Sequence, residues 1–293
     1  MIAAISRFWI LLLAVTVLPL SADDAPNFLV AGMRVVPRQW DKEANLQVLE
    51  KYAREASAQG VKLLVTCEGF LDGYTSNPKM TPDLTRDKFF AFGEKVDGPI
   101  LDRVASLAAQ YKIHLAVGFA ERRGNKMFNS VLVFNPNGDR VLHYSKTHNP
   151  RPDAEPFNTL GNHFPVVSTP VGQLGALVCY DRRMPEAARI LAIKGAQIII
   201  IPGYGTDGDR NEALLRTRAW ENSVYVMWVK QNQVLIINPS GKIIARDDGN
   251  GDQLVTARVE LNDQVGTGDI RNRTPAIYRE ILQSNPVQSQ FDR

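Results

Sequence analysis

An α/β layered fold with mixed sheets in one domain is the fold class that the sequence predicts, and three observations support it. Segments with apolar residues at helical spacing alternate with short, nearly continuous apolar runs, which is typical of helices layered on a sheet. The Asn-Pro-Asn-Gly run at 135–138 and the Asn-Pro-Ser-Gly run at 238–241 predict β-hairpins, and therefore antiparallel pairs. The middle of the 293-residue chain carries no linker rich in Gly, Ser or Pro and no internal repeat, which favours one domain.

The first half of the chain is expected to form two long helices and several strands. Apolar residues recur at helical spacing over 41–59, and Gly60 ends this helix as a C-cap. A second helix is expected over 99–111. The stretch 69–92 is rich in Gly, Pro, Asn and Asp without a clear period, which predicts a loop with one short helix at most. The expected strands span 27–36, 61–67, 114–120, 129–134 and 141–144.

The second half repeats the alternation after a loop over 147–164. Helices are expected over 186–194 and 210–222. The expected strands span 166–168, 174–178, 196–201, 223–229 and 253–259. Residues 266–293 form a polar extension beyond the main domain at 23–265, and we expect it to pack on the body or on a second subunit.

The N-terminus has the pattern of a secretory signal peptide over residues 1–22. Arg7 precedes an apolar run at 8–18, and Ala22 offers a small residue for cleavage. The run is shorter than the roughly 20 residues that a membrane span needs, although an uncleaved anchor is the alternative. Export to the periplasm or the medium is therefore expected. The formal net charge of +3, without a long Lys/Arg run, gives no indication of nucleic-acid binding.

A candidate nucleophile, Cys179, lies on a sharp turn between a predicted strand and a helix that opens near Pro185. Such a turn lifts one side chain clear of the sheet, and a thiol there can act as a nucleophile. The alternative is a small apolar residue that fills space in the core. The other cysteine, Cys67, could pair with it in an exported protein. However, Cys67 and Glu68 are strand neighbours and face opposite sides, so we expect Cys67 in the core if Glu68 faces a pocket.

Glu68, Lys146 and Cys179 each follow a predicted strand, and ligand sites of open α/β sheets lie at such strand ends. Taken singly, each charged residue is more often a solvated surface group. Their surroundings form three blocks, 68–74 (EGFLDGY), 143–148 (HYSKTH) and 175–186 (GALVCYDRRMPE). Together with 216–226 and 236–245, these blocks closely resemble the nitrilase, or carbon–nitrogen hydrolase, superfamily over nearly the whole mature chain.

The resemblance implies a fold and a mechanism. The fold would be a four-layer α-β-β-α sandwich of two mixed sheets. Cys179 would attack the substrate carbon, with Glu68 as general base. Lys146 and the N–H of Tyr180 would stabilise the oxyanion. A second acid is expected in the loop after the lysine, where Glu155 is the best match and Asp153 its rival.

The resemblance also implies the kind of substrate. The Cys-x-Asp-Arg-Arg pattern is similar to that of N-carbamoyl-D-amino-acid hydrolases, whose arginines bind the substrate carboxylate. On this basis Arg182 and Arg183 would bind substrate, although Arg183 could instead be structural, bound to Asp181 or to backbone. The other expected substrate-binding residues are Tyr74, His148 and Tyr180.

An amidase or N-carbamoyl hydrolase is favoured over a nitrilase, an N-acyltransferase or a degenerate protein that only binds small molecules. A papain-like Cys–His peptidase is disfavoured because no His follows Cys179. The four histidines lack metal-site spacing, so no metal and no cofactor are expected. The expected partners are a small amide or carbamoyl substrate and a second copy of the chain in a homodimer or a higher homo-oligomer.

Overall fold

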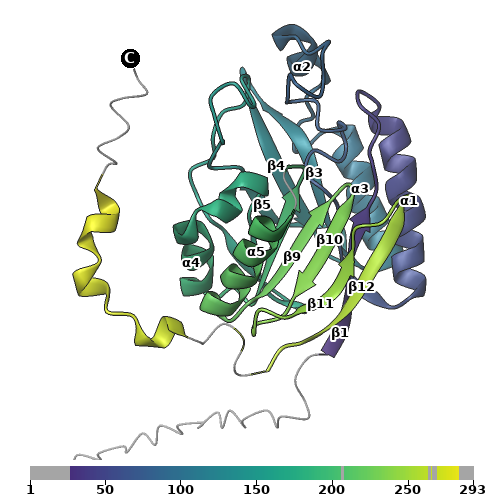
Figure 1. The fold of residues 1–293 in the computed structure, drawn as a ribbon. Helices are drawn as coiled ribbons and strands as arrows, with labels where there is room; N and C mark the ends of the chain where they lie inside the picture. Colours follow the sequence, from purple (N-terminus) through teal and green to yellow (C-terminus); the bar gives the residue numbers. More distant parts are fainter. Residues whose placement is uncertain (1–26, 206–207, 263–264, 266–268, 284–293) are drawn as a thin grey trace, which may run out of the picture.

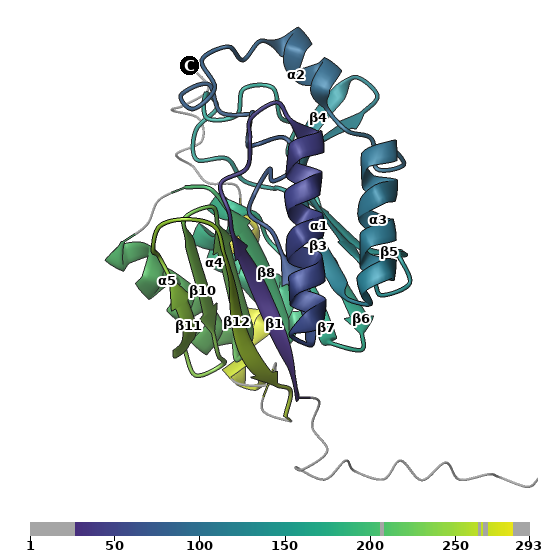
Figure 2. The same cartoon turned by 90° about the vertical axis from the view of Figure 1, so that its right-hand side faces the viewer.

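Two six-stranded mixed sheets lie face to face at the centre of the molecule, and helices cover the outer face of each (Figure 1). The computed structural model describes residues 27–205, 208–262, 265 and 269–283. Figure 2, turned by 90°, shows helices α1 and α3 side by side over one sheet, with α5 beyond the other. The predicted signal peptide at 1–22 lies outside the described residues.

The first sheet has the strand order β12-β1-β2-β3-β4-β5. Strand β1 runs parallel to β2 and β2 runs parallel to β3, whereas the other neighbours pair antiparallel. The carboxyl ends of β1, β2 and β3 therefore meet at one edge. The strands are β1 (Asn27–Arg34), β2 (Val61–Val65), β3 (His114–Arg123), β4 (Lys126–Phe134), β5 (Arg140–Ser145) and β12 (Gln253–Glu260).

The second sheet has the order β11-β10-β9-β8-β7-β6, with β7, β8 and β9 parallel. Ile198–Gly203 forms its buried central strand β8, and the neighbouring strands β7 and β9 are mostly apolar as well. A strand covered on both faces needs apolar residues at successive positions, which explains the continuous apolar runs of the sequence. The other strands are β6 (Val166–Thr169), β7 (Gly172–Ala176), β9 (Tyr225–Lys230), β10 (Gln233–Ile237) and β11 (Ile243–Asp247).

The helices begin and end where the sequence supplies caps. Asp41 accepts a hydrogen bond from the N–H of Ala44 at 2.9 Å and so starts α1. Gly60 follows the same helix with a φ of +78°, in the left-handed region that glycine adopts without strain. A proline opens α3 and α4, where its missing N–H costs nothing. The helices are α1 (Lys42–Ala58), α2 (Arg86–Phe92), α3 (Pro99–Tyr111), α4 (Pro185–Ile193) and α5 (Asp209–Asn222).

Alternate residues of the first sheet face two separate apolar cores. Val30 and Val65 lie in the core that includes the second sheet with α4 and α5. Met33 and Leu64 lie in the core with α1 and α3. Cys67 belongs to the second of these cores and Cys179 to the first, and both thiols are free. The prediction that Cys67 is a core residue without a disulfide is therefore confirmed.

The elements follow the predictions closely, with differences at strand ends. The helix over 99–111 has the predicted bounds, and α2 is the short helix expected within 69–92. Strand β3 continues through charged residues to Arg123 instead of ending at 120, and β7 ends at Ala176 instead of 178. In the described residues, no helix is long and apolar enough to cross a membrane.

The C-terminal extension forms three short 3-10 turns in its described part, drawn in yellow in Figure 1 on the side of α4 and α5. The first turn, Asp269–Asn272, contacts α5, and Ile270 packs against the core. The following turns are Pro275–Ile277 and Arg279–Leu282, whose large apolar side chains are exposed.

Candidate active site

Cys179 opens a short 3-10 helix, Cys179–Arg183, that joins the end of β7 to α4. Its φ is +46°, in the left-handed region that a residue with a side chain rarely adopts. Strain of this kind persists only where surrounding contacts hold it, and it is frequent at functional sites. The predicted strand–turn–helix corner is therefore present, with the thiol buried at its apex.

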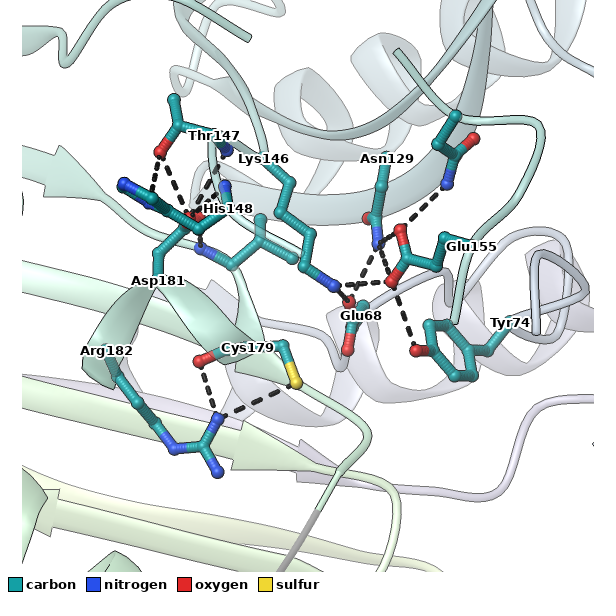
Figure 3. A network of polar contacts seen from close by, with 12 residues as sticks. Glu68, Tyr74, Asn129, Lys146, Thr147, His148, Glu155, Cys179, Asp181 and Arg182 are labelled. Carbon is teal, nitrogen blue, oxygen red and sulfur yellow. Dashed lines mark hydrogen bonds and ion pairs between the residues drawn. The ribbon is translucent and has the colours of Figure 1, made fainter. Parts of the chain in front are cut away.

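Asp181 holds this corner against the chain segment that follows β5. Its carboxylate accepts hydrogen bonds from the N–H of Val178 at 3.0 Å and the hydroxyl of Tyr144 at 2.8 Å. It also accepts from the backbone and side chains of Thr147 and His148. Because Thr147 directly follows Lys146, one buried carboxylate fixes the position of Lys146 relative to Cys179 (Figure 3).

Lys146 lies between two buried carboxylates, Glu68 and Glu155 (Figure 3). Its Nζ donates to Oε1 of Glu68 at 2.9 Å and also to Oε1 of Glu155. Glu68 follows β2 in the first sheet, and Lys146 follows β5 of the same sheet. The topology therefore gathers Glu68 and Lys146 at one edge of the sheet, although they are far apart in sequence.

Amide and hydroxyl groups complete the hydrogen bonding of the two carboxylates. Asn129 Nδ2 donates to Glu68 Oε1 at 2.7 Å and to both oxygens of Glu155 at 3.3 Å. Tyr74 and Asn158 donate to Glu155 at 3.2 Å and 2.9 Å. Of the four oxygens of these two carboxylates, only Glu68 Oε2 has no hydrogen-bond partner among the described residues. Glu155 is thus held on both oxygens, whereas Glu68 keeps one oxygen available.

The three charges have different proton affinities. Burial raises the pKa of Glu68, Lys146 opposes this rise, and Glu155 adds to it. Burial alone would lower the pKa of Lys146, but the charges of Glu68 and Glu155 raise it well above its ordinary value. Burial alone would raise the pKa of Glu155, but Lys146 and the amides lower it. Lys146 is therefore a stable cation and Glu155 a stable anion, and Glu68 is the carboxylate that takes up a proton most readily.

The Cys179 thiol needs a base before it can react. Burial and the charge of Glu68 raise the pKa of the thiol, whereas Lys146 and Arg182 act in the opposite direction. The resting nucleophile is therefore the neutral thiol. The thiol in turn lowers the pKa of the Glu68 carboxyl. Nucleophile and base thus meet at one point.

A cavity of about 160 Å³ opens over Cys179. Six of the side chains that border it matter for the chemistry: Tyr74, Lys146, Cys179, Tyr180, Arg182 and Arg183. Three of these carry a positive charge and none a negative one, because Glu68 and Glu155 lie behind Lys146 rather than on the cavity wall. Within the described part of the chain, no three His, Cys, Asp or Glu side chains gather as a metal site would require.

A model of the carbon-nitrogen hydrolase family matches residues 29–267, which is most of the chain. The chain belongs to the carbon-nitrogen hydrolase family. A hydrolase in the pqqF 5′ region of Pseudomonas protegens is 33% identical over 286 residues, covering 93% of this chain and 94% of that one. The deaminated glutathione amidase of Bos taurus is 30% identical over 252 residues, covering 76% of this chain and 74% of that one.

Solved structures of the nitrilase superfamily share the fold. The amidase NitN of Nesterenkonia sp. AN1 superposes with a TM-score of 0.73 at 24% identity, covering 87% of this chain and all of that one. The predicted resemblance and the four-layer sandwich are therefore confirmed.

Of the two rival acids for this carbon-nitrogen hydrolase, the structure brings Glu155 to Lys146. Asp153 is exposed and pairs with Arg151 at 3.1 Å. Tyr74, Tyr180, Arg182 and Arg183, for which substrate binding was predicted, border the cavity.

Two expectations at the cavity need correction. His148 is not among the described residues that border the cavity, because Asp181 binds its Nδ1 at 2.9 Å and draws the ring aside. Arg183 does not bind Asp181, whose oxygens are taken by Tyr144, Thr147 and His148. Its guanidinium instead lies 5.2 Å from the centre of the Tyr180 ring, at the mouth of the cavity.

Sequence reasoning missed the polar residues that hold the charged ones in place. Asn129, Asn158 and Asn211 were not among the candidates, although they contact Glu68, Glu155 and Arg182. Asparagines are common in loops and caps, so a single one carries little signal. The one indication in the sequence was that Asn129 begins a predicted strand, which pairs with the predicted strand that precedes Lys146. Asp181 stood inside the cysteine block, where its spacing to Val178 suits a turn-capping carboxylate.

Proposed function

We propose that this carbon-nitrogen hydrolase cleaves small non-peptide amides or N-carbamoyl compounds through a thioester on Cys179. The observation that carries the proposal is the buried Glu68–Lys146–Glu155 network beside a neutral thiol at the base of a small cavity. A neutral thiol with a carboxylate base and a fixed cation is the set of groups that acyl transfer requires.

The first half of the reaction forms the thioester. Glu68 takes the thiol proton as the sulfur of Cys179 bonds to the carbonyl carbon. The carbonyl oxygen becomes an oxyanion, which the Lys146 ammonium and the N–H of Tyr180 stabilise. When the oxyanion collapses, the carbon–nitrogen bond breaks and Glu68 returns the proton to the leaving amine or ammonia.

The second half releases the acid and restores the enzyme. A water takes the place of the departed amine, and Glu68 removes one of its protons as the oxygen bonds to the thioester carbon. Lys146 and Tyr180 stabilise the second oxyanion in the same way. Its collapse breaks the carbon–sulfur bond, and Glu68 protonates the leaving thiolate. Glu155 remains ionised throughout, which keeps Lys146 protonated in a buried site.

The cavity supports a small substrate that is neutral or negatively charged. A volume of about 160 Å³ is close to that of an engineered cavity that holds one benzene. The acyl part of the substrate therefore contains about six non-hydrogen atoms. Arg183 is exposed at the mouth, where it can bind a carboxylate at the far end of the substrate. The relatives include a deaminated glutathione amidase and also proteins named as nitrilases, so amides and nitriles are both tested below.

A panel of short aliphatic amides, half-amides of dicarboxylic acids, N-carbamoyl amino acids and nitriles, assayed for ammonia release, tests this proposal. We expect turnover of one of the amide or carbamoyl groups, and its loss in Cys179→Ala. Release from nitriles alone would show a nitrilase, and transfer of the acyl group to added hydroxylamine without hydrolysis would show an acyltransferase. If wild type and Cys179→Ala bind a ligand equally well and neither turns it over, the protein only binds small molecules.

We further propose that the protein is exported and cleaved near Ala22. The charge and apolar pattern of residues 1–22 supports this. Sequencing the N-terminus of protein isolated from its native host tests it. A mature N-terminus close to residue 23 is expected, and retention of Met1 in the bulk of the protein would contradict cleavage.

A further inference from the structure

We infer that Arg182 is a positioning residue for the nucleophile: it holds the Cys179 peptide and places a fixed positive charge beside the sulfur. This inference rests on the proposed function, since it concerns the same thiol. It assigns to Arg182 a different task from the binding of a substrate carboxylate that the sequence pattern implies.

The guanidinium lies against Cys179 on the side away from Glu68 and Lys146 (Figure 3). One Nη donates to the carbonyl oxygen of Cys179 at 2.6 Å, and the same nitrogen is 3.7 Å from Sγ. The Nε donates to Oδ1 of Asn211 at 2.5 Å. The side chain is almost wholly buried although it borders the cavity. A single side chain thus contacts both the backbone and the sulfur of the nucleophile.

The second sheet provides a platform for this guanidinium. Its centre lies 4.4 Å from the ring centre of Trp228, a buried residue of β9. Gly203 of β8 leaves the room that the indole needs, because a Cβ at that position would lie 2.2 Å from the ring. Trp228 is fixed in turn by the hydrogen bond of its Nε1 to Gln233 at 3.1 Å. A cation held over an indole face and by an amide has little freedom to turn toward a ligand.

The contact with the carbonyl oxygen also controls an N–H group. A peptide unit is planar and trans, so its C=O and its N–H point in opposite directions. Holding the Cys179 carbonyl toward Arg182 therefore directs the N–H of Tyr180 away from the guanidinium. That N–H is the backbone donor proposed for the oxyanion. Because Cys179 has a φ of +46°, this peptide needs an external anchor, and Arg182 supplies it.

The charge of Arg182 acts on the sulfur itself. It lowers the pKa of the thiol against the rise caused by burial and Glu68. Lys146 approaches from the other side and acts in the same direction. As the thiol loses its proton to Glu68, the thiolate therefore develops between two fixed cations. A guanidinium suits this position because it stays protonated and its planar fork contacts two atoms at once.

Three variants separate the charge of Arg182 from its hydrogen bonds. Arg182→Met keeps the bulk of the stem and removes both charge and donors. Arg182→Lys keeps the charge and loses the fork. Asn211→Ala keeps the guanidinium and removes the acceptor of its Nε. Arg210→Gln, at an exposed position of α5 next to Asn211, is the matched control. Circular dichroism and thermal melting establish that each variant is folded.

The first readout is the rate at which iodoacetamide alkylates Cys179, measured across pH by mass spectrometry of the cysteine peptide, with Cys179→Ala as the blank. We expect Arg182→Met to lower the rate at pH 7 about tenfold and to move the profile to higher pH, because a neighbouring cation is lost. Arg182→Lys is expected to restore most of the profile, Asn211→Ala to shift it less than Arg182→Met, and Arg210→Gln to leave it unchanged. This readout needs no substrate, so its failure is distinct from failure of the proposed function.

The second readout is steady-state turnover on a neutral and an acidic substrate. If Arg182 positions the nucleophile, each of the two variants Arg182→Met and Arg182→Lys lowers kcat by a similar factor on the neutral and on the acidic substrate. The expected factor is about a hundredfold, as for the loss of one aligned oxyanion donor. The inference is overturned if Arg182→Met keeps the wild-type alkylation profile and raises KM for the acidic substrate alone. It is also overturned if Arg182→Met is folded and turns over both substrates at the wild-type rate.

Discussion

At the residue scale, the two oxygens of Glu68 have different surroundings. Oε1 is held by Lys146 at 2.9 Å and by Asn129 at 2.7 Å, whereas Oε2 has no partner at ordinary geometry among the described residues. The held oxygen fixes the carboxylate, and the other one is available to exchange a proton with the thiol, the amine or water. Glu155 has donors on both oxygens and serves to keep Lys146 charged.

Glu155 and Asp153, the two acids of the loop after β5, give a matched test of the role of Glu155 in keeping Lys146 charged. Glu155→Gln removes the charge that balances Lys146, so the oxyanion contact weakens, and we expect kcat/KM to fall about a hundredfold or more. Asp153→Asn changes an exposed pair with Arg151 and is expected to stay within about twofold of wild type. Steady-state kinetics of both variants check this. Equal effects of the two substitutions would contradict the role of Glu155.

The raised pKa of Glu68 sets the acidic side of the activity profile. A general base must be ionised, so kcat/KM falls as pH drops through the pKa of Glu68, which lies above the ordinary 4.5. Asn129→Ala removes a donor that stabilises the carboxylate, and it should move this acidic limb to higher pH. Asn158→Ala, whose amide contacts Glu155 instead, is the control and should move the limb less. A limb that stays in place or moves to lower pH in Asn129→Ala would refute the assignment.

At the element scale, close packing of β3 places Glu68. A Cβ on Gly118 of β3 would lie 2.5 Å from the carbonyl oxygen of Cys67. The N–H of Gly118 donates to the hydroxyl of Thr66 at 3.1 Å, and its carbonyl accepts from Leu71 at 3.1 Å. The turn that carries Glu68 is therefore pressed onto the neighbouring strand, which fixes the direction of the catalytic carboxylate.

A buried polar cluster joins β3, β4 and β5 near the site. Glu121 binds Arg123 from its own strand, Ser130 from β4 and His143 from β5. Although burial alone would raise the pKa of Glu121, hydrogen bonds from these three side chains lower it to about 2. A carboxyl with a lowered pKa stabilises the fold above its unfolded pKa, and this stability is lost as pH falls through the folded value.

The lowered pKa of Glu121 predicts how the free energy of unfolding changes with pH. Between pH 6 and pH 2, the contribution of Glu121 should decline by about 3 kcal/mol, since each pKa unit corresponds to about 1.4 kcal/mol. Glu121→Gln should therefore be less stable than wild type at pH 6, and the difference should shrink toward pH 2. Urea unfolding across this range measures it. Asp102→Asn removes an exposed partner of Arg140 and is the control, with a small difference at every pH. A difference for Glu121→Gln that grows as pH falls would contradict the account.

At the scale of the whole molecule, the C-terminal turns lie on the same side as α4 and α5 (Figure 1), and these elements carry several large exposed apolar side chains. Trp220 is 60% exposed and Leu282 is 89% exposed. Ile193, Ile277 and Ile281 are also exposed. Large exposed apolar groups are typical of interaction surfaces, and on this basis we propose that a second copy of the chain covers this side in a homodimer.

Light scattering on a sizing column tests the homodimer. We expect a mass twice that of one chain, and a shift toward a single chain in Trp220→Glu, because a buried charge at an interface is costly. Val36→Glu changes another exposed apolar side chain, which follows β1, and should leave the mass unchanged. A single-chain mass for the wild-type protein at micromolar concentration would rule out the dimer.

The sequence predicted most of this architecture because its signals are local. Helix α3 has the predicted bounds since Pro99 starts it and the apolar spacing continues to its end. Strand β3 extends beyond the prediction because Glu121 is charged yet buried, and its partners on other strands are invisible to a local pattern. Contacts between distant segments also limit what the sequence predicts about the active site. Glu68, Lys146 and Cys179 lie in recognisable blocks, whereas the choice of Glu155 over Asp153 depends on how an irregular loop folds. The position of Arg182 depends on Asn211 and Trp228, which follow it by tens of residues.

The thioester on Cys179 can be detected directly from the mass of enzyme quenched in acid during turnover of an amide from the substrate panel. We expect the peptide containing Cys179 to gain the mass of the acyl group, and Cys179→Ala neither to gain it nor to release ammonia. An acyl group found on another residue, or steady ammonia release by Cys179→Ala at a rate near that of wild type, would contradict the thioester mechanism.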